Sequence, residues 1–456
     1  MELHEKCGVV GVKADGKDVY PDLYHGLYTL QHRGQESAGI AVENGGISVV
    51  KGMGLVSEAL KNQYLQGDAG IGHVRYSNTG CSSIQNSQPL LIKHSCGSFA
   101  LAHNGNLVNY HELLSMLEGK GNIFTTTSDT EVIAQLIARE NIRCQDFTQA
   151  IANAMKYLVG SYSLVILHKK EIYAVRDPNG IRPLAIGKTP DGYIVASESC
   201  VFGVLGYEFV RDVKPGEIVC INDGLHSMQA LPSEPKHCMF EYVYFARPDS
   251  LLDGHKVYTV RRNLGINLGK TSAPKDADMV IAVPDSGINH AIGYAEGSGI
   301  RYGEGLIKNR YVGRTFIFPQ QDLRERGVRL KLNAIKSQVA GKKIVMVDDS
   351  IVRGTTTRKL VKVLRDAGAK EVHARVACPP IRSPCYYGID MQNAGEFIAN
   401  GKTVEEIAKE IGADTLEYSS IESLVDAIGI PKENLCMACL TGEYPVKEKQ
   451  AKLTDL

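Results

Sequence analysis

Two adjacent carboxylates follow an apolar run in the second half of the chain. The run Val345–Val347 leads into Asp348 and Asp349, and a loop of small residues then reaches Gly354 and three threonines. Acidic residues directly after a buried strand are costly unless they bind something. Glycine lets the backbone approach a ligand closely, and the first N–H groups of a helix attract anions. The pattern predicts a phosphate site whose carboxylates bind ribose hydroxyls or Mg²⁺. It lacks the Gly-x4-Gly-Lys-Ser/Thr spacing of a P-loop.

This motif resembles the 5-phosphoribosyl-1-pyrophosphate (PRPP) motif of type I phosphoribosyltransferases. The resemblance implies that PRPP is bound by Asp348, Asp349, Ser350, Arg353, Gly354, Thr355, Thr356 and Thr357. A second loop, with Asp285 and Ser286, is expected to contact pyrophosphate, although alone it could be an ordinary helix cap. The Mg²⁺ shell is expected to include Ser286, Asp348 and Asp349. A basic segment that ends near Lys331 resembles the family's closing loop; a solvated basic loop is the alternative.

A possible nucleophile, Cys7, heads an apolar run near the start of the chain. A cysteine there is usually packing, but four further segments change the interpretation: 30–40, 72–77, 103–107 and 128–131. Together with Cys7 they resemble the glutaminase domain of the N-terminal-nucleophile amidotransferases. The resemblance implies that the Cys7 thiolate attacks the glutamine amide and that its own α-amino group is the general base. Residues 1–6 are therefore expected to be a propeptide that is removed.

The same resemblance implies a role for each polar residue around Cys7. Asn104 and the N–H of Gly105 are expected to form the oxyanion hole. Arg75 is expected to pair with the α-carboxylate of glutamine, and Asp129 to hold its α-ammonium group. Arg33 is expected to help bind glutamine, and it belongs to the loop that orders the site. One departure is Asn78, which stands where many relatives carry Thr.

Four of the eleven cysteines are candidate metal ligands. Cys436 and Cys439 form a Cys-x-x-Cys pair, and Cys238 and Cys385 lie in contexts that could complete a set of four. The pair alone is ambiguous among redox, zinc and iron–sulfur roles. A thioredoxin-like pair should open a helix after a strand, and the flanking residues do not indicate one. The resemblance to the cluster-bearing branch of the amidophosphoribosyltransferases favours a [4Fe–4S] cluster with a structural role, and Zn²⁺ is the alternative.

The composition is that of an ordinary globular protein of two or three domains. The chain has 456 residues, 43% hydrophobic and 22% charged, and its 51 basic residues balance 51 acidic ones. The charge shows no basic bias of the kind that indicates nucleic-acid or membrane-surface binding. The sequence has no run of 18 apolar residues that would predict a membrane span, and its polar first residues lack the apolar segment of a secretory signal. We therefore expect a cytoplasmic protein.

The predicted elements divide the chain into two architectures. The first half has short strands with clustered helices, which indicates a layered α+β domain. Its predicted strands are 7–12, 37–43, 47–51, 69–76, 98–103, 161–167 and 172–176. The second half has buried runs at 279–283, 343–347 and 371–378 with helical patterns between them, which is βαβ order with a parallel sheet. We therefore expect an αββα N-terminal-nucleophile glutaminase domain and an α/β type I phosphoribosyltransferase domain.

The two motif sets together predict one bifunctional enzyme. The expected divisions are a 1–6 propeptide, a glutaminase domain at 7–230, a transferase domain at 231–430 and a tail at 431–456. The resemblance to amidophosphoribosyltransferases implies transfer of glutamine ammonia to C1 of PRPP, in the first committed step of purine synthesis. It also implies a homotetramer inhibited by purine nucleotides. A glucosamine-6-phosphate synthase would not need the PRPP motif, and a PRPP-sensing repressor would need a DNA-binding element that the sequence does not show.

Overall fold

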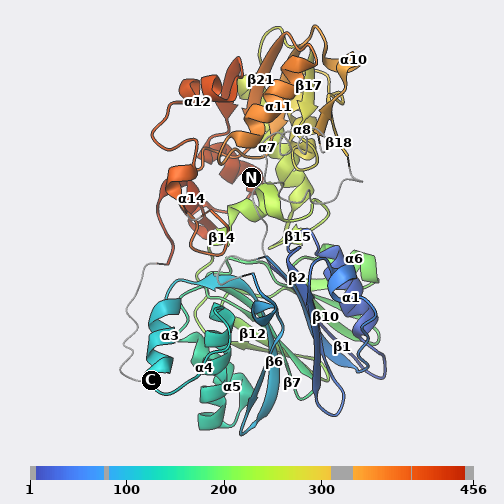
Figure 1. Ribbon diagram of the computed structural model, residues 1–456, viewed down its shortest axis with the longest axis vertical. Helices are drawn as coiled ribbons and strands as arrows, with labels where there is room; N and C mark the ends of the chain where they lie inside the picture. The colour runs from blue at the N-terminus through green and yellow to red at the C-terminus, as the bar shows by residue number, and fades with distance from the viewer. Residues whose placement is uncertain (1–6, 77–81, 310–331, 392, 447–456) are drawn as a thin grey trace.

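The computed structural model describes residues 7–76, 82–309, 332–391 and 393–446. The chain forms two lobes, with the first half of the sequence in one and most of the second half in the other (Figure 1). The expected propeptide 1–6, Asn78, Lys331 and nearly all of the predicted closing loop lie outside the described residues.

The first lobe contains two antiparallel sheets. One has seven strands in the order β11-β9-β10-β1-β4-β2-β3, and the other has six in the order β13-β12-β8-β7-β6-β5. The seven strands are β1 Gly8–Ala14, β2 Ser37–Glu43, β3 Ile47–Met53, β4 Ala69–Arg75, β9 Ala185–Thr189, β10 Gly192–Ala196 and β11 Glu208–Asp212. The six strands are β5 Leu90–His94, β6 Gly97–Leu107, β7 Gly160–His168, β8 Glu171–Arg176, β12 Glu217–Ile221 and β13 Leu225–Gln229.

Three apolar layers hold this lobe together. Side chains such as Ile71, Val165 and Val195 fill the space between the two sheets. A second layer lies between the seven-stranded sheet and helices α1 (Tyr20–Thr29) and α6 (Cys200–Leu205). A third lies between the six-stranded sheet and helices α3 (Tyr110–Glu118), α4 (Asp129–Cys144) and α5 (Phe147–Met155). Both faces of each central strand are buried, and this confirms the predicted αββα architecture.

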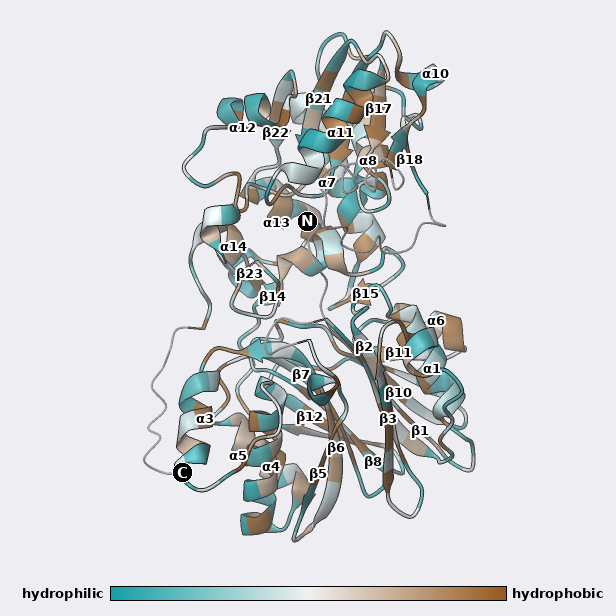
Figure 2. Cartoon of the chain, in the orientation of Figure 1, coloured by the Kyte–Doolittle hydropathy of each residue, from teal (hydrophilic) through white to brown (hydrophobic). Residues whose placement is uncertain are grey.

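The second lobe is built on a parallel four-stranded sheet in the order β17-β20-β21-β22. These strands are Met279–Ala282, Lys343–Asp348, Glu371–Val376 and Thr415–Tyr418. Helices α7 (Val257–Ser272) and α8 (Ile288–Ser298) cover one face, and α11 (Thr355–Asp366) and α12 (Val404–Ile411) cover the other. Helices α11 and α12 present mainly hydrophilic residues to the outside, whereas strand β17 is hydrophobic (Figure 2). The predicted α/β domain with a parallel sheet is confirmed.

Shorter elements complete the second lobe and its junction with the first. They are a π-helical turn η2 at Glu241–Phe245, the short helices α10 (Lys336–Val339), α13 (Ile421–Ile428) and α14 (Ala438–Thr441), and three two-stranded pairs. The pairs are β14 His237–Cys238 with β23 Leu435–Cys436, β15 Leu251–Leu252 with β16 His255–Lys256, and β18 Leu306–Lys308 with β19 Leu332–Ala334. No helix in the described ranges is long and apolar enough to cross a membrane.

The parallel pair β14·β23 corrects one sequence-based prediction. Cys436 ends strand β23, and Cys439 lies in helix α14 directly after it. The pair therefore does open a short helix after a strand, contrary to our expectation. The two-residue strand exists because it pairs with residues 237–238, far away in the sequence, so its local sequence carries no strand pattern.

Candidate active sites

The Cys7 thiol lies at the head of β1, beside the end of strand β4. Gly8 pairs with Val74, and the Cys7 Sγ lies 3.6 Å from the carbonyl oxygen of Tyr76. Burial raises the pKa of this thiol to about 11, and the nearby Arg75 only partly opposes that effect. The thiol is therefore protonated near neutral pH, and it needs a base before it can attack a carbonyl carbon.

Strand β6 carries a buried donor without a partner close to this region. Asn104 is 1% exposed, and its Nδ2 has no hydrogen-bond partner among the described residues. Its neighbour Gly105 has φ +159°, and a Cβ there would lie 2.0 Å from the carbonyl oxygen of Ser161. The backbone can therefore follow this path only with glycine. A buried amide that lacks an acceptor costs about 1–3 kcal/mol, so the strand is prepared for an incoming oxygen atom.

Asp129 and Arg75 are both buried charged groups with partners. Asp129 begins helix α4, and its Oδ2 accepts a hydrogen bond of 3.0 Å from the Leu107 N–H at the end of β6. Burial alone would raise the pKa of Asp129, but His103 and backbone donors outweigh burial and hold it below its usual range. Arg75 ends β4 and forms a close ion pair with Glu36. Both residues are thus charged and fixed on elements that flank Cys7 and Asn104.

The second site is a cavity of about 470 Å³ at the carboxyl ends of the parallel strands. It is lined by the predicted motif residues Asp285, Ser286, Asp348, Asp349, Ser350, Arg353, Gly354, Thr355, Thr356 and Thr357. Gly354 has φ +71° and precedes helix α11, and a Cβ there would lie 2.2 Å from Ile398. The structure therefore brings together every predicted PRPP residue except Lys331, which lies outside the described residues.

The two adjacent carboxylates of this cavity form no ion pair within the described chain, although Arg261 also lines the cavity and partly opposes the effect of burial on the pKa of Asp349. The Asp349 carboxylate accepts hydrogen bonds from Ser286 at 2.5 Å and from Ser350 at 2.6 Å. Burial raises the pKa of Asp348, and the neighbouring Asp349 raises it further. Burial also raises the pKa of Asp349. A bound cation would offset this cost, and one or two carboxylates with a hydroxyl fit the sparse protein shell that Mg²⁺ uses.

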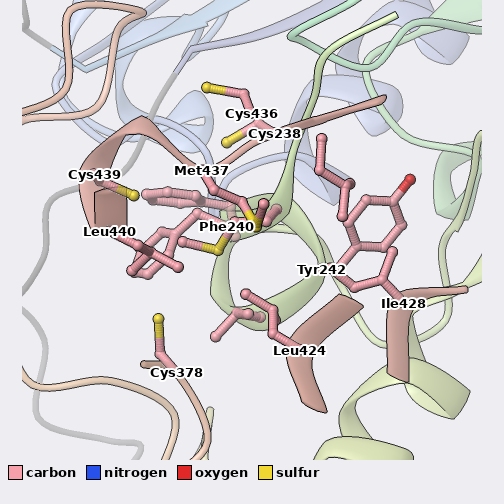
Figure 3. Packing of buried hydrophobic residues seen from close by; sticks show 14 of the residues in the cluster. Cys238, Phe240, Tyr242, Cys378, Leu424, Ile428, Cys436, Met437, Cys439 and Leu440 are labelled. Atoms are coloured by element: carbon pink, nitrogen blue, oxygen red, sulfur yellow. The ribbon is translucent and has the colours of Figure 1, made fainter. Parts of the chain in front are cut away.

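The four candidate metal-binding cysteines gather in one apolar cluster between the lobes. Cys238 and Cys436 are register partners, and they lie side by side in Figure 3, with Cys439 near Met437. The Cys439 carbonyl accepts the N–H groups of Arg382 and Ser383, which draws the segment that carries Cys385 toward it. All four thiols are free and buried. Among the described residues, no three potential ligands stand close enough to hold a single metal ion.

Known proteins resemble this chain over nearly its whole length. A glutamine amidotransferase domain model matches residues 73–202. An amidophosphoribosyltransferase of Methanothermobacter thermautotrophicus is 53% identical, with 97% of this chain and 95% of the relative covered. That of Bacillus subtilis is 50% identical, with 98% and 95% covered. The chain belongs to the amidophosphoribosyltransferase family. The solved B. subtilis glutamine PRPP amidotransferase, complexed with ADP and GMP, superimposes with a TM-score of 0.91 at 48% identity over 98% of each chain.

Membership of the amidophosphoribosyltransferases fixes the reaction. The protein is a pentosyltransferase of purine biosynthesis that takes ammonia from glutamine and places it on PRPP, with 5-phosphoribosylamine, glutamate and pyrophosphate as products. The predicted function is confirmed, and the sugar-synthase and repressor alternatives are excluded.

The amidophosphoribosyltransferase fold also contains a buried charge network that the sequence analysis missed. The Arg33 guanidinium, 1% exposed, pairs with Glu198 of its own lobe and with Glu241 across the junction. Arg182 donates to the same Glu241 at 3.0 Å. These contacts place Arg33 in an ion-pair network between the lobes. A sequence signal existed: Glu241 is the one carboxylate in the apolar run 239–245, so burial with a cationic partner was predictable.

Residues of the first lobe also reach the cavity at the carboxyl ends of the parallel strands. His32 and Gln35 line it, and Glu198 accepts a hydrogen bond from His32 at 2.7 Å and from the Arg247 N–H at 2.8 Å. Burial alone would raise the pKa of Glu198, but Arg33 and His32 outweigh it and hold the carboxyl ionised. The Glu198 carboxylate therefore holds walls of this cavity that come from both lobes.

Proposed function

We propose that Cys7, with its α-amino group freed by removal of residues 1–6, is the glutaminase nucleophile. The observation that carries this proposal is the buried, unpartnered amide nitrogen of Asn104 on the strand next to the Cys7 region. With the N–H of Gly105 it would donate to the oxygen that becomes negative when the thiolate attacks. The α-amine, with an ordinary pKa of about 8, is well matched to take the thiol proton at neutral pH.

The proposed glutamine contacts follow from the charges around Cys7. Arg75 would bind the α-carboxylate, and its partner Glu36 would keep the guanidinium oriented. Asp129, whose pKa is held low, would bind the α-ammonium group. For Arg33 we propose an ordering role between the lobes, because two carboxylates occupy its guanidinium.

The proposed PRPP site uses the strand-end cavity and Mg²⁺. The amide groups and hydroxyls of the loop from Ser350 to Thr357 would hold the 5-phosphate, and Asp348 and Asp349 the ribose hydroxyls. Ser286, Asp348 and Asp349 would contribute to the Mg²⁺ shell, and the ion would offset the charge on the departing pyrophosphate. Asp285 would contact pyrophosphate. Lys331 is proposed to contact it from the closing loop.

We propose that Cys238, Cys385, Cys436 and Cys439 bind a [4Fe–4S] cluster. Four free thiols with no histidine or carboxylate completing the set suit iron–sulfur ligation, and Zn²⁺ is the alternative for the same donors. A buried cation supports the assignment, because Arg182 lies where it can offset thiolate charge: it contacts Tyr387, two residues from Cys385, and its neighbour Ile181 accepts the Cys238 N–H. The cluster would tie the linker to the tail and hold no reacting atom.

The remaining proposals concern the whole chain. We place a glutaminase domain at 7–230, a transferase domain at 231–430 and a cysteine-bearing tail at 431–456. We also propose a cytoplasmic homotetramer that purine nucleotides inhibit; the ADP and GMP in the B. subtilis complex support the inhibition proposal.

The experiment that tests the glutaminase proposal separates the two half-reactions. Asn104→Ala should lower glutamine-dependent kcat by about 10²–10³-fold and leave ammonia-dependent synthesis of phosphoribosylamine unchanged. Asn153→Ala, on the outer helix α5, is the matched control and should change neither rate. Equal loss of both activities in Asn104→Ala would show a structural role instead. Mass spectrometry of the active protein should find a chain that begins at Cys7.

A further inference from the structure

A separate pocket of about 340 Å³ lies on the glutaminase lobe, outside both active sites. It is formed where the edge strand β5 meets helix α4 and the turn after α3. Its lining combines four basic residues with three apolar residues and two amides: Lys93, His94, Arg139 and Arg143; Ile92, Ala138 and Ile142; and Asn122 and Gln135. We refer to it as the basic pocket.

Two residues of the basic pocket carry buried polar atoms without partners in the described part of the chain. They are the Nη1 of Arg139 and the Nε2 of His94. The other ring nitrogen of His94, Nδ1, accepts the N–H of Cys96 at 3.4 Å. Because burial lowers the pKa of His94, the ring is neutral at pH 7, and its proton is therefore on Nε2. Both unpartnered atoms are thus donors, and both need an acceptor.

The charges around the pocket define the kind of acceptor. Arg139, Arg143 and Lys93 line it, and Arg139 and Arg143 also act on Lys120, whose pKa is lowered by partial desolvation and by these two cations. Among the described residues, the one carboxylate that pairs with a lining residue is Glu140, which engages Arg143 at 2.9 Å. Arg139 forms no ion pair among the described residues. The cations therefore outnumber the carboxylates, and a neutral acceptor would leave this excess unbalanced.

We infer that the basic pocket binds an oxyanion, as inorganic phosphate or as the phosphate group of a small organic molecule. Arg139 and His94 donate to the anion, and Lys93 and Arg143 contribute charge. Ile92 and Ile142, the latter 48% exposed, provide an apolar wall for the organic part of a ligand. Neither Arg139 nor His94 belongs to the glutaminase or transferase machinery, so the site does not depend on the proposed function.

The test locates the anion directly. Crystals soaked in tungstate, a heavy analogue of phosphate, should show an anomalous peak between Arg139 Nη1 and His94 Nε2. The peak should vanish in Arg139→Gln and persist in Lys188→Gln, the loss of an exposed charge on β9 of the same lobe. A peak only in the PRPP cavity, an equal peak in Arg139→Gln, or density for a single water in the basic pocket would overturn the inference.

A solution measurement distinguishes the two sources of the anion. With the PRPP cavity filled by PRPP and Mg²⁺, calorimetric titration with inorganic phosphate and with phenyl phosphate reports the remaining site. Arg139→Gln should weaken binding about tenfold or more, because it removes a charged donor. Tighter binding of phenyl phosphate assigns an organic ligand, and equal binding assigns the free ion. No binding by wild type, or binding that Arg139→Gln leaves unchanged, would contradict the site. Glutaminase activity of Arg139→Gln should equal that of wild type, which shows that the variant folds.

Discussion

A thiol is a poor nucleophile until a base removes its proton, and this holds for Cys7, which is partly buried. Burial raises its pKa to about 11. Near it lie the Asn104 amide nitrogen, which has no hydrogen-bond partner among the described residues, and the Arg75 guanidinium, which pairs with Glu36. The arrangement therefore requires a base that the described residues do not supply, and the α-amine of a processed Cys7 would provide it.

The reactivity of Cys7 should consequently depend on whether residues 1–6 are attached. In the uncleaved chain at pH 8, a pKa of about 11 leaves roughly 0.1% of the thiol ionised, so iodoacetamide should alkylate Cys7 at least about tenfold more slowly than in the processed chain. Peptide mapping measures both rates, and the half-exposed Cys144 serves as an internal reference. Equal rates at Cys7 in the two forms would contradict the role of the amine.

At the scale of elements, one short segment joins the cysteine cluster to the glutaminase strand. Asn106, next to Gly105 on β6, donates to the Tyr386 carbonyl at 2.9 Å, and Ser161 on β7 donates to the Tyr387 carbonyl at 2.9 Å. Arg182 donates to that same Tyr387 oxygen. Segment 385–388 thus runs from a proposed cluster ligand directly onto the strand of the proposed oxyanion hole.

Arg182→Gln should accordingly affect both ends of this segment. Because it leaves Glu241 buried with one cation fewer, we expect a loss of about 3–5 kcal/mol of stability. We also expect faster loss of iron in air, followed by visible absorbance, and lower glutamine-dependent activity. The matched control Arg262→Gln breaks the exposed pair with Glu296 and should leave the stability close to that of wild type.

An Arg182→Gln protein that keeps its iron as long as wild type would show that this cation does not support the cluster. If the same protein also hydrolysed glutamine at the wild-type rate, the link through segment 385–388 would be wrong as well. Arg182→Lys should restore part of each property, because it keeps the charge but loses the two parallel donors to Tyr387.

Across the whole molecule, the sequence predicted the strands and loops that depend on local residue patterns. The strands around Cys7 and the Asp348–Thr357 loop were predictable because apolar runs and glycine loops are local signals. Helix α7 was not predictable, because its packing face depends on glycines that let it approach α8 closely. A Cβ on Gly265 would lie 2.0 Å from the His290 carbonyl oxygen. The Arg33–Glu241 pair joins residues of different lobes, so residue spacing could not reveal it.

The folded molecule also holds neutral histidines, and this determines its response to acid. Burial lowers the pKa of His73 and of His290 to about 3. The unfolded chain binds these protons near pH 6.5, whereas the folded chain does not, so stability is present above pH 6.5 and is lost as the pH falls toward 3. Acid should therefore weaken the fold before most carboxylates are protonated.

Replacing one of these histidines should make the loss less steep. For His290→Gln, the fall in unfolding free energy between pH 6.5 and pH 4 should be smaller than in wild type by about 1.4 kcal/mol per pH unit. Thermal unfolding followed by circular dichroism across this range measures it. The solvent-exposed His226→Gln is the control and should retain the wild-type slope. Parallel curves for His290→Gln and wild type would mean that His290 takes up its proton in the folded state.

The pairing of β14 with β23 has a consequence for biogenesis. Cys238 and Cys436 meet across roughly 200 residues of chain, so the loop that they close contains almost the entire second lobe. During translation the glutaminase sheets can assemble early, but the thiols cannot come together until the tail has left the ribosome. Delivery of iron and sulfide for the proposed cluster would therefore act on a nearly finished polypeptide, and a stalled or truncated chain would present an assembled first lobe with no place to receive them.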